Sequence, residues 1–598
     1  MKRLFPIALI ASLCLTACSR FAADEESVVV LYTSDIHGNV LPFDFTTGKA
    51  TTSSMAHIYT YVDRTRQANP DGVILLDGGD LAQGNPAMYY YNYVAMRTPH
   101  LAARAVNALN YDAIVFGNHD LDAGPITYID RLPRQCDMPI LGANAIDTRT
   151  GDPLYEPYTI VERKGYRFAV IGFLNPAVYR WLPKSVWPNL NFNDMITSAE
   201  YWLPIIREKE KPDFIVGVFH AGTERYDIDE YNRRKPRIDG ALQTIQHVAG
   251  FDLALLGHSH EPITDFIIND YGDTVHVLQP SAHAEEIGRA DIRLHRDKEG
   301  KAHCNIALSR VRMDEVAPDR DFIAKFDVDA DSINSFLDNP LGYSVINLEG
   351  ASSLTGPSTL IDLVHTVQLD VTHADISLAS ALSTFSDIPA GPISRRQIFA
   401  IYKYENQVHT VWMTGAEVHQ FLEWGYARQF NQMRDSNDYV LGFKFGQKGE
   451  VTYGRFGPNL KTPQYNFTSA AGINYSVDIS KPEGERVTIT SMADGTPFKP
   501  ERKYTVALNS YQASGGGGFT TNALGWTPED RRFHTINEST KDMCFYISNY
   551  IREHGNFKPT DNGHWCVQPQ MWWARNHHRD IDLLLPYLAG GGSGKTTD

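Results

Sequence analysis

The sequence predicts an α/β protein with two domains of comparable size, and three observations support this prediction. The chain has 598 residues, whereas single hydrophobic cores rarely grow beyond about 300 residues. Hydrophobic residues make up 42% and charged residues 21% of the chain, which is an ordinary globular composition. In the first half, short apolar runs alternate with longer stretches that suit helices, which is the pattern of a buried sheet with helices on its faces.

The first residues resemble a bacterial secretion signal. Lys2 and Arg3 precede an apolar run at residues 4–15 that is broken only by Ser12 and is too short to span a bilayer. The run ends in Leu15-Thr16-Ala17-Cys18, which resembles a lipoprotein processing site. This resemblance implies removal of residues 1–17, lipidation of Cys18 and attachment to a membrane outside the cytoplasm. The alternative is an ordinary cleaved signal peptide in which Cys18 has no role.

Residues 18–27 are polar and acidic, and we expect them to form a tether. Beyond them, Cys136, Cys304, Cys544 and Cys566 are far apart and form no CxxC pair, which predicts neither a zinc knot nor a disulfide scaffold. The formal net charge of the chain is −16 at pH 7. A chain with this charge has no general attraction for phosphate backbones, so we expect no nucleic-acid polymer among its partners.

Apolar runs that suit buried strands recur through the first half, and each is followed by polar residues. The runs occupy residues 28–32, 73–76, 113–116, 214–219 and 253–256. Helical stretches fit between them, for example at residues 55–66, 100–109 and 196–208. Such sheets present functional groups at the carboxyl ends of their strands, so we expect the polar residues after the runs to meet: Asp35, His37, Asp80, Asn118, His119, His220, His258 and His260.

These residue types predict a site for two divalent metal ions. Carboxylate, imidazole and carboxamide groups without thiolates suit Zn, Mn, Fe, Co or Ni better than a closed structural zinc site. The donors exceed the need of one ion but suit two ions that share a carboxylate, clamp phosphoryl oxygens and activate a water. Asp35 and His37 are two residues apart, so in an extended chain they would point to the same side, as would His258 and His260. Any one histidine alone could be a structural residue; the set favours metal.

The order of these motifs, DxH, GD, GNHD, H and GHSH, resembles the calcineurin-like binuclear metallophosphoesterases over residues 28–290. The resemblance implies a four-layer α-β-β-α catalytic domain, here residues 28–311. It also implies which residues hold which ion. One ion would be held by Asp35, His37, Asp80 and His260, and the other by Asp80 as the bridge with Asn118, His220 and His258.

The segment Gly117-Asn118-His119-Asp120-Leu121-Asp122 resembles the GNHEFD pattern of the nucleotidase branch, with Asp120 at the Glu position. The resemblance implies that His119 lies beside the scissile phosphate, where it stabilises transition-state charge or protonates the leaving oxygen. Asn118 would help to hold the transition state, and Asp122 would orient His119.

The second half resembles the substrate-binding domain of exported 5'-nucleotidases and, more closely, of bacterial 2',3'-cyclic-nucleotide 2'-phosphodiesterase/3'-nucleotidases. This implies an α/β 5'-nucleotidase-type domain at residues 345–588, after a linker at residues 312–344 whose helix stops at Asn339-Pro340. We expect residues 589–598 to be a disordered tail.

In that family two aromatic rings sandwich the nucleotide base, and Phe467 and Phe519 occupy the corresponding positions. Gly516, Gly517 and Gly518 would let the backbone approach the ligand closely. The alternative for Phe467 is an ordinary core aromatic residue. The strict 5'-nucleotidases carry a substrate-binding arginine in a glycine-rich segment, whereas this chain has Ser377-Leu378-Ala379-Ser380-Ala381-Leu382 there. The difference favours cyclic and 3'-phosphate substrates over 5'-monophosphates.

The sequence therefore predicts an extracytoplasmic enzyme that hydrolyses 2',3'-cyclic nucleotides and nucleoside 3'-monophosphates by attack of a metal-activated water. Three alternatives remain open. The same metal site could act on 5'-nucleotides or UDP-sugars, it could act on a sulfur ester, or the chain could be a binding lipoprotein that has lost catalysis. The metal identity and the oligomeric state are left open by the sequence.

Overall fold

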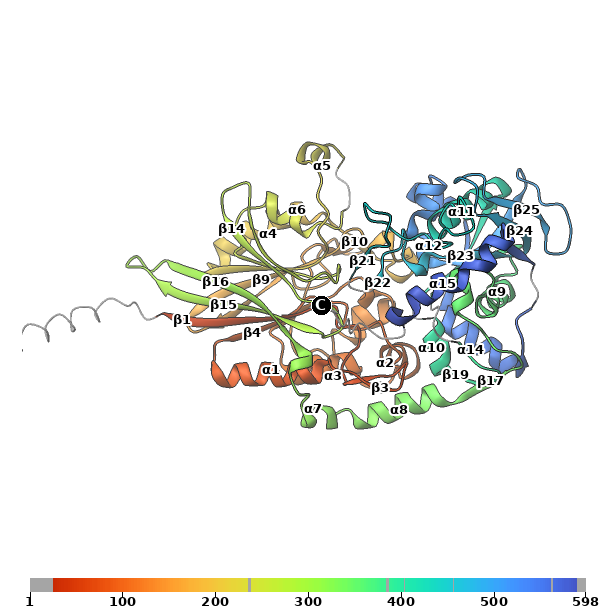
Figure 1. Cartoon of the computed structure of the whole chain (residues 1–598). Coiled ribbons are helices and arrows are strands. Elements are labelled where there is room, and N and C mark those ends of the chain that lie inside the picture. Colours follow the sequence, from red (N-terminus) through yellow and green to blue (C-terminus); the bar gives the residue numbers. More distant parts are fainter. Residues whose placement is uncertain are drawn as a thin grey trace, which may run out of the picture.

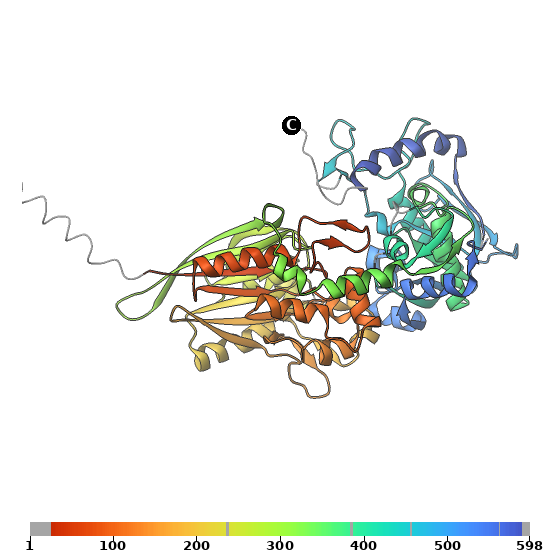
Figure 2. The same ribbon diagram turned by 90° about the horizontal axis from the view of Figure 1, so that it is seen from below.

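The computed structural model describes residues 25–588 except for 235–237, 383–386, 403, 455–456 and 561–562. The predicted lipidation site Cys18 and the predicted tail at 589–598 lie outside the described residues. The first domain and the second domain lie side by side, joined by the helix α8 (Figures 1 and 2).

The first domain is built on two six-stranded sheets. In the first sheet the strands lie in the order β16 (Ala302–Arg312), β15 (Glu286–Arg296), β1 (Glu26–Thr33), β4 (Val73–Asp77), β5 (Ala113–Val115) and β6 (Ile140–Leu141). In the second sheet the order is β13 (Ile263–Ile268), β14 (Thr274–Gln279), β12 (Leu253–Leu256), β11 (Phe214–His220), β9 (Tyr166–Leu174) and β8 (Tyr158–Arg163). All five strands predicted from apolar runs are present.

Alternate residues of the central strands enter different cores, as the two-residue period of a strand requires. On β11, Val216 and Val218 join the core between the sheets, whereas Ile215 and Phe219 join the core on the outer face. The helices α1 (Met55–Ala68) and α3 (Leu101–Leu109) contribute buried residues to a cluster that is continuous through the first sheet with the core between the sheets. The helices α4 (Met195–Glu210) and α6 (Ala241–His247) contribute to the outer core on the second sheet. This arrangement is the predicted four-layer α-β-β-α fold, and it explains why these runs are apolar on both faces.

The parallel strands of each sheet point the same way. β1, β4, β5 and β6 are parallel neighbours, as are β9, β11, β12 and β14. The carboxyl ends of these strands therefore form one edge of each sheet. The hydroxyl of Tyr32 on β1 donates to the Leu256 carbonyl on β12 at 3.0 Å, so the two edges are close to each other.

Two helices, α7 (Arg320–Ala324) and α8 (Asp327–Asp338), connect the domains, and α8 ends immediately before Asn339-Pro340 as predicted. The next strand, β17 (Pro340–Ser344), falls in the segment predicted as linker, but it pairs with β19 (Gly391–Ser394) and β28 (Asn556–Phe557) of the second domain. The helix contributes to the interface: Tyr89 of the first domain lies 6.4 Å from the Phe336 ring and 4.8 Å from the Phe399 ring.

The second domain is a mixed α/β unit. Its main sheet has the order β23 (Thr468–Ala471), β18 (Ile376–Ser380), β26 (Lys503–Asn509), β20 (Gln407–Thr414) and β27 (Thr535–Asp542). A three-stranded sheet is formed by β25 (Val487–Met492), β24 (Ile473–Asp478) and β29 (Trp565–Gln568). The helices are α9 (Thr359–Thr372), α10 (Arg395–Ile401), α11 (Gly415–Gln429), α12 (Ser510–Ala513), α13 (Pro528–His534), α14 (Met543–His554) and α15 (Gln570–Leu588).

Two smaller findings concern the cysteines and the possibility of a membrane-spanning helix. Cys136, Cys304, Cys544 and Cys566 are free thiols in this structure. Among the described residues, no helix is both long and apolar enough to cross a membrane.

Candidate active site

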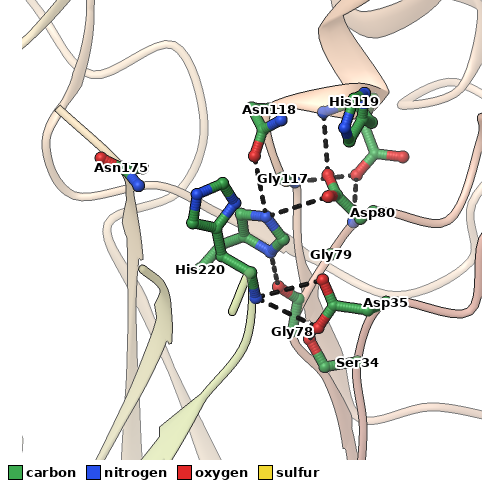
Figure 3. A network of polar contacts seen from close by, with 12 residues as sticks. Ser34, Asp35, Gly78, Gly79, Asp80, Gly117, Asn118, His119, Asn175 and His220 are labelled. Carbon is green, nitrogen blue, oxygen red and sulfur yellow. Dashed lines mark hydrogen bonds and ion pairs between the residues drawn. The ribbon is translucent and has the colours of Figure 1, made fainter. Parts of the chain in front are cut away.

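The polar residues at the strand ends come together at the seam between the two sheets. Asp35, Asp80 and Asn118 follow β1, β4 and β5 of the first sheet, His220 ends β11, and His258 follows β12 of the second sheet. Figure 3 shows these loops converging from both sides on one small region. Two groups of three ligands form there, Asp35 with His37 and His260, and Asp80 with His220 and His258.

The first group has the geometry of a metal site. The Nε2 atoms of His37 and His260 are 3.1 Å apart, and His260 Nε2 lies 3.4 Å from Asp35 Oδ1. Ligands of a tetrahedral zinc ion with bonds of about 2.0 Å lie about 3.3 Å apart. The Nδ1 atom of His37 is 3.1 Å from the Gln83 carbonyl oxygen, which leaves Nε2 free to bind a metal. Two imidazole nitrogens that face each other at this distance fit a shared cation.

The second group is arranged in the same way. His220 Nε2 lies 3.2 Å from Asp80 Oδ2 and 3.2 Å from Asn118 Oδ1. His220 Nδ1 donates to the Gly78 carbonyl at 2.7 Å, so its Nε2 is the nitrogen left for a metal. His258 Nε2 lies 3.4 Å from Asp239 Oδ2, a carboxylate that completes the surroundings of this histidine.

Asp80 lies between the two groups. Its Oδ2 atom is 3.2 Å from His220 Nε2 of the second group and 4.0 Å from His37 Nε2 of the first. Its Oδ1 atom accepts the backbone N–H of His119 at 2.8 Å. A carboxylate in this place is suited to bridge two ions, because its Oδ2 atom faces a histidine of each group.

The electrostatics of the site without metal are those of a cation site. Burial would raise the pKa of Asp35, but the hydrogen bond from His260 and the charge of His220 lower it to about 2. Burial would lower the pKa of His220, but the Asp80 carboxylate outweighs it and raises the pKa to about 10. Burial lowers the pKa of His37 to about 3, so this imidazole is neutral and has a free lone pair. Negative charge is thus concentrated here, and a proton on His220 balances part of it.

The backbone of the site differs from the extended chain predicted around Asp35 and His37. These two residues have φ of 55° and 48°, and Asp80, His258 and His260 also lie in the left-handed region, with φ of 57°, 71° and 59°. Left-handed residues other than glycine are uncommon and cost of order 1 kcal/mol each or more. The ligands therefore project from tight turns after the strands. His258 and His260 consequently point to different groups and do not share one.

His119 lies beside the two groups and is held from behind. Its Nδ1 is 2.7 Å from Asp122 Oδ2, and its side chain is 32% exposed. Burial would lower the pKa of His119, but the carboxylates of Asp80 and Asp122 raise it to about 9. The contact with Asp122 therefore fixes the ring orientation of His119 and leaves Nε2 as the nitrogen that can meet a ligand.

The sequence pattern assigned no role to Asp120 and did not indicate Asn175 or Asp239, which also belong to the site. Asp120 accepts backbone N–H groups of Asp80, Leu81, Ala82 and Gly117, all at 2.8–3.0 Å, and so ties two ligand loops together. Asn175 follows β9 and donates to Asp239 Oδ1 at 2.6 Å. The apolar run at 168–174 that ends in Asn175 repeats the pattern used for the other strands and could have identified it. No comparable pattern precedes Asp239.

These features define a class of protein. A sandwich of two sheets, with two adjoining groups of carboxylate and imidazole ligands and an oriented histidine beside them, is the centre of a metal-dependent hydrolase. Residues 28–262 match the family model described as calcineurin-like phosphoesterase, and residues 338–523 match that of the 5'-nucleotidase C-terminal domain. The chain is therefore a phosphoester hydrolase that combines a calcineurin-like phosphoesterase domain with a 5'-nucleotidase C-terminal domain.

Relatives and a solved structure agree with this architecture. The chain is 26% identical to a 2',3'-cyclic-nucleotide 2'-phosphodiesterase/3'-nucleotidase of Yersinia enterocolitica, over 94% of this chain and 91% of the relative. It is 25% identical to a 5'-nucleotidase of Vibrio parahaemolyticus, over 79% of this chain and 90% of that protein. Its fold is similar to that of a 5'-nucleotidase precursor from Thermus thermophilus, with a TM-score of 0.57 and 20% identity over 91% of this chain and 99% of the other.

The two predicted base-stacking rings are buried. Phe467 is 2% exposed and Phe519 is 1% exposed. The ring of Phe519 stacks on Phe421 with centroids 4.5 Å apart and an interplanar angle of 26°, so one of its faces is covered by the second domain's own core. In this conformation neither phenylalanine offers a free face to a ligand.

Three tyrosines of the second domain form a cluster, in which Tyr404 and Tyr465 are exposed and Tyr511 is half-buried. Tyr465 is 38% exposed and Tyr404 is 41% exposed, and their ring centroids are 6.3 Å apart. Tyr511 lies 6.2 Å from Tyr465 with the two rings nearly perpendicular. A Cβ atom on Gly516 would come within 2.5 Å of the Tyr511 ring, so the glycine makes room for this tyrosine. The sequence signals were Tyr465-Asn466-Phe467 and Asn509-Ser510-Tyr511, next to residues already selected.

Proposed function

We propose that this protein is an extracytoplasmic enzyme that hydrolyses 2',3'-cyclic nucleotides and nucleoside 3'-monophosphates. The observation that carries the proposal is the pair of ligand groups that share Asp80, with the His119–Asp122 pair beside them. The Yersinia relative is a 2',3'-cyclic-nucleotide 2'-phosphodiesterase/3'-nucleotidase and matches 94% of this chain, which supports the choice of substrate.

The roles of the residues follow from their positions. Asp35, His37 and His260 would hold one divalent ion, Asp80 would bridge, and Asn118, His220 and His258 would hold the second. Bound ions of this kind polarise phosphoryl oxygens and lower the pKa of a water between them. Asn118 offers an amide to the same region, and His119 Nε2 faces it while Asp122 fixes the ring. A protonated His119 can stabilise charge on the phosphoryl group or give its proton to the leaving oxygen.

For the base, we propose stacking on Tyr465 and Tyr511, because Tyr465 is exposed and Tyr511 is half-buried, whereas the predicted rings of Phe467 and Phe519 are buried. Stacking of a base on an aromatic ring contributes about 1–3 kcal/mol. Gly516, Gly517 and Gly518 then serve the site indirectly. Gly516 lies under the Tyr511 ring, and Gly517 and Gly518 adopt φ of 67° and 74° in the turn that carries Phe519.

A preference for cyclic and 3'-phosphates is supported by the lack of a positively charged side chain at residues 377–381. Residues 377–381, where strict 5'-nucleotidases carry an arginine, are buried and belong largely to β18. Ser380 uses its hydroxyl within this core, where Gln512 Nε2 donates to it at 3.0 Å. This segment therefore offers no positive charge to a 5'-phosphate.

The experiment is phosphate release by the purified protein loaded with Mn or Zn. The substrates are 2',3'-cAMP, 3'-AMP, 5'-AMP, UDP-glucose and bis-p-nitrophenyl phosphate, with a phosphomonoesterase added for the diesters. Faster turnover of 2',3'-cAMP and 3'-AMP supports the proposal. Faster turnover of 5'-AMP would overturn the substrate preference but keep the metal site, and hydrolysis of none of them would overturn the proposal.

Base stacking is tested separately with Tyr511→Ala. We expect KM for 3'-AMP to rise about 5- to 100-fold, the equivalent of about 1–3 kcal/mol, with turnover of bis-p-nitrophenyl phosphate unchanged because this substrate has no base. Tyr343→Ala is the matched control, since Tyr343 is 49% exposed on β17 of the same domain and belongs to another sheet. An unchanged KM for 3'-AMP in Tyr511→Ala, with a rise in Phe519→Ala, would return the role to the phenylalanines.

We further propose that Cys18 carries a lipid and anchors the enzyme to a membrane outside the cytoplasm. The sequence Leu15-Thr16-Ala17-Cys18 after an apolar run supports this proposal. In phase partition with a detergent, the native protein is expected in the detergent phase and Cys18→Ser in the aqueous phase. The same partition for both proteins would show that the cysteine is not the anchor.

A further inference from the structure

A chain of polar contacts crosses the interface between the domains and ends at His119. Glu405 lies in the loop between α10 and β20 of the second domain, and Tyr93 lies in a helical turn, Tyr90–Val94, of the first. Tyr93 Oη is 2.8 Å from Glu405 Oε2 and 3.4 Å from the carbonyl oxygen of Asp122. The side chain of Asp122 in turn holds His119 Nδ1 at 2.7 Å.

The two contacts of Tyr93 require a second hydrogen. A tyrosine hydroxyl has one hydrogen, whereas Glu405 as a carboxylate and the Asp122 carbonyl are both acceptors. Both contacts become hydrogen bonds if Glu405 carries a proton, because Glu405 then donates to Tyr93 and Tyr93 donates to Asp122. Burial, with the carboxylates of Asp122 and Asp542 nearby, raises the pKa of Glu405 well above its usual range. A neutral Glu405 is therefore consistent with its surroundings.

Among the described residues, the side chain of Glu405 caps no helix and its hydrogen bond is the one to Tyr93. Its neighbour Asp542 begins α14 and accepts the Phe545 backbone N–H at 3.0 Å, so that carboxylate caps a helix. Among the residues that the structure describes, Glu405 forms no ion pair with a lysine or arginine. Its hydrogen bond to Tyr93 crosses to the first domain. Glu405 also directly follows Tyr404, which belongs to the tyrosine cluster described above.

We propose that Glu405 is a positioning residue of the second domain which acts through Tyr93 to hold the Asp122–His119 pair in its working orientation. The link exists only when the second domain is docked as in this structure. The domain that would bind the base therefore also sets the histidine that faces the phosphate. This inference rests on the role proposed above for His119, and it adds that the second domain takes part in the chemical step as well as in substrate binding.

The test is a double-mutant cycle on the full-length, metal-loaded protein. Glu405→Leu removes the polar link, and His119→Asn removes the group that the link positions. If Glu405 acts through His119, Glu405→Leu in the native protein lowers kcat for 3'-AMP about tenfold and changes KM less than about twofold. When His119→Asn is already present, adding Glu405→Leu lowers kcat by less than about twofold. Glu405→Gln is expected to restore most of kcat, because its amide N–H can donate to Tyr93 as the carboxyl does.

Two further variants keep the result specific. Tyr93→Phe removes the hydroxyl in the middle of the link and is expected to reproduce the loss of kcat in Glu405→Leu. The matched control is Tyr504→Phe, whose hydroxyl accepts the Lys499 backbone N–H at 2.8 Å near the start of β26, the end of that strand remote from Tyr511. This control loses one hydrogen bond of a buried tyrosine without touching the link, and its kcat is expected to be unchanged.

The outcomes separate this inference from the proposed function. Equal losses of kcat in the native and His119→Asn backgrounds, or a rise in KM alone, would overturn the positioning role while nucleotide hydrolysis stands. If the protein hydrolyses bis-p-nitrophenyl phosphate but no nucleotide, the substrate proposal fails, and the same cycle on the diester still decides the role of Glu405. Absence of both activities in the metal-loaded protein would overturn both proposals.

Discussion

Asp120 and Asp122 are two residues apart, and the structure gives them opposite duties. Asp120 is 1% exposed and its carboxylate accepts four backbone N–H groups, two on each oxygen. Within the described part of the chain, the Asp122 side chain makes its hydrogen bond to His119 only. We predict that Asp120→Asn damages stability, whereas Asp122→Asn damages catalysis and leaves stability almost unchanged.

The size of the effect follows from the hydrogen-bond count. Asparagine has one carbonyl oxygen, so whichever way the amide is turned it accepts two of the four N–H groups and points its own NH₂ at the other two. Hydrogen bonds to a charged group contribute about 1.5–3 kcal/mol each, and two lost bonds correspond to about 3–6 kcal/mol. Burial and the Asp80 charge raise the pKa of Asp120 to about 6, which offsets part of the gain. We therefore expect a loss near the lower end, about 3 kcal/mol.

The assay is thermal and urea unfolding at pH 8, where Asp120 is ionised, together with kcat for 3'-AMP. A loss of about 3 kcal/mol lowers the Tm of a domain of this size by about 6–12 °C. Asp122→Asn is the matched control. It is expected to move Tm by less than about 3 °C but to lower kcat at least tenfold, because an amide does not stabilise a protonated His119 as a carboxylate does.

A reversal of this pattern would refute the reasoning. If Asp120→Asn unfolds within about 0.5 kcal/mol of the native protein, the four N–H groups do not depend on the carboxylate. If the metal-loaded Asp122→Asn variant retains the native kcat, the contact between Asp122 and His119 does not contribute to catalysis.

Three other outcomes are expected. Asp80→Ala should lose nearly all turnover and bind fewer ions per chain by metal analysis; native turnover with the metal removed would contradict a metal mechanism. Because His220 has a pKa of about 10 without metal, metal binding at pH 7 should release a proton from it, and the metal affinity should rise with pH up to about pH 10. Titration calorimetry in two buffers of different ionisation enthalpy measures the proton release. Metal binding without proton release would contradict this prediction. Gly516→Ala should displace the Tyr511 ring, which a Cβ would approach within 2.5 Å, and raise KM for 3'-AMP with an unchanged Tm; an unchanged KM would argue against this ring as the base contact.

The strands that lead into the ligand loops could be predicted, because their signals are local. Strands buried on both faces require continuous apolar runs, and the runs at 73–76 and 253–256 became β4 and β12 with little change. A parallel sheet places its strand ends at one edge, which brings Asp80 toward Asp35 in the first sheet and His258 toward His220 in the second. The meeting of the two edges was implied only by the resemblance to a known family. The division of the ligands into two groups depended on the resemblance to a known family.

Other features could not be predicted, because they depend on contacts between distant segments. The left-handed backbone at Asp35 is selected by the loops around it, and propensity alone would not place a non-glycine residue there. Whether Phe519 faces a ligand or the core is decided by Phe421, almost a hundred residues earlier in the chain. Glu405 and Tyr93 belong to different domains, and no local pattern signals their contact.

The seam position of the metal site has a mechanical consequence. Asp35 and Asp80 extend from one sheet, and His220 and His258 from the other. Ions bound by both sets of ligands would act as cross-links between two layers that otherwise adhere mainly through apolar side chains, which resist separation but allow sliding. Loading the site should therefore stiffen the sandwich against shear at this end, and the spacing of the reacting groups would then depend on how firmly the two layers are clamped.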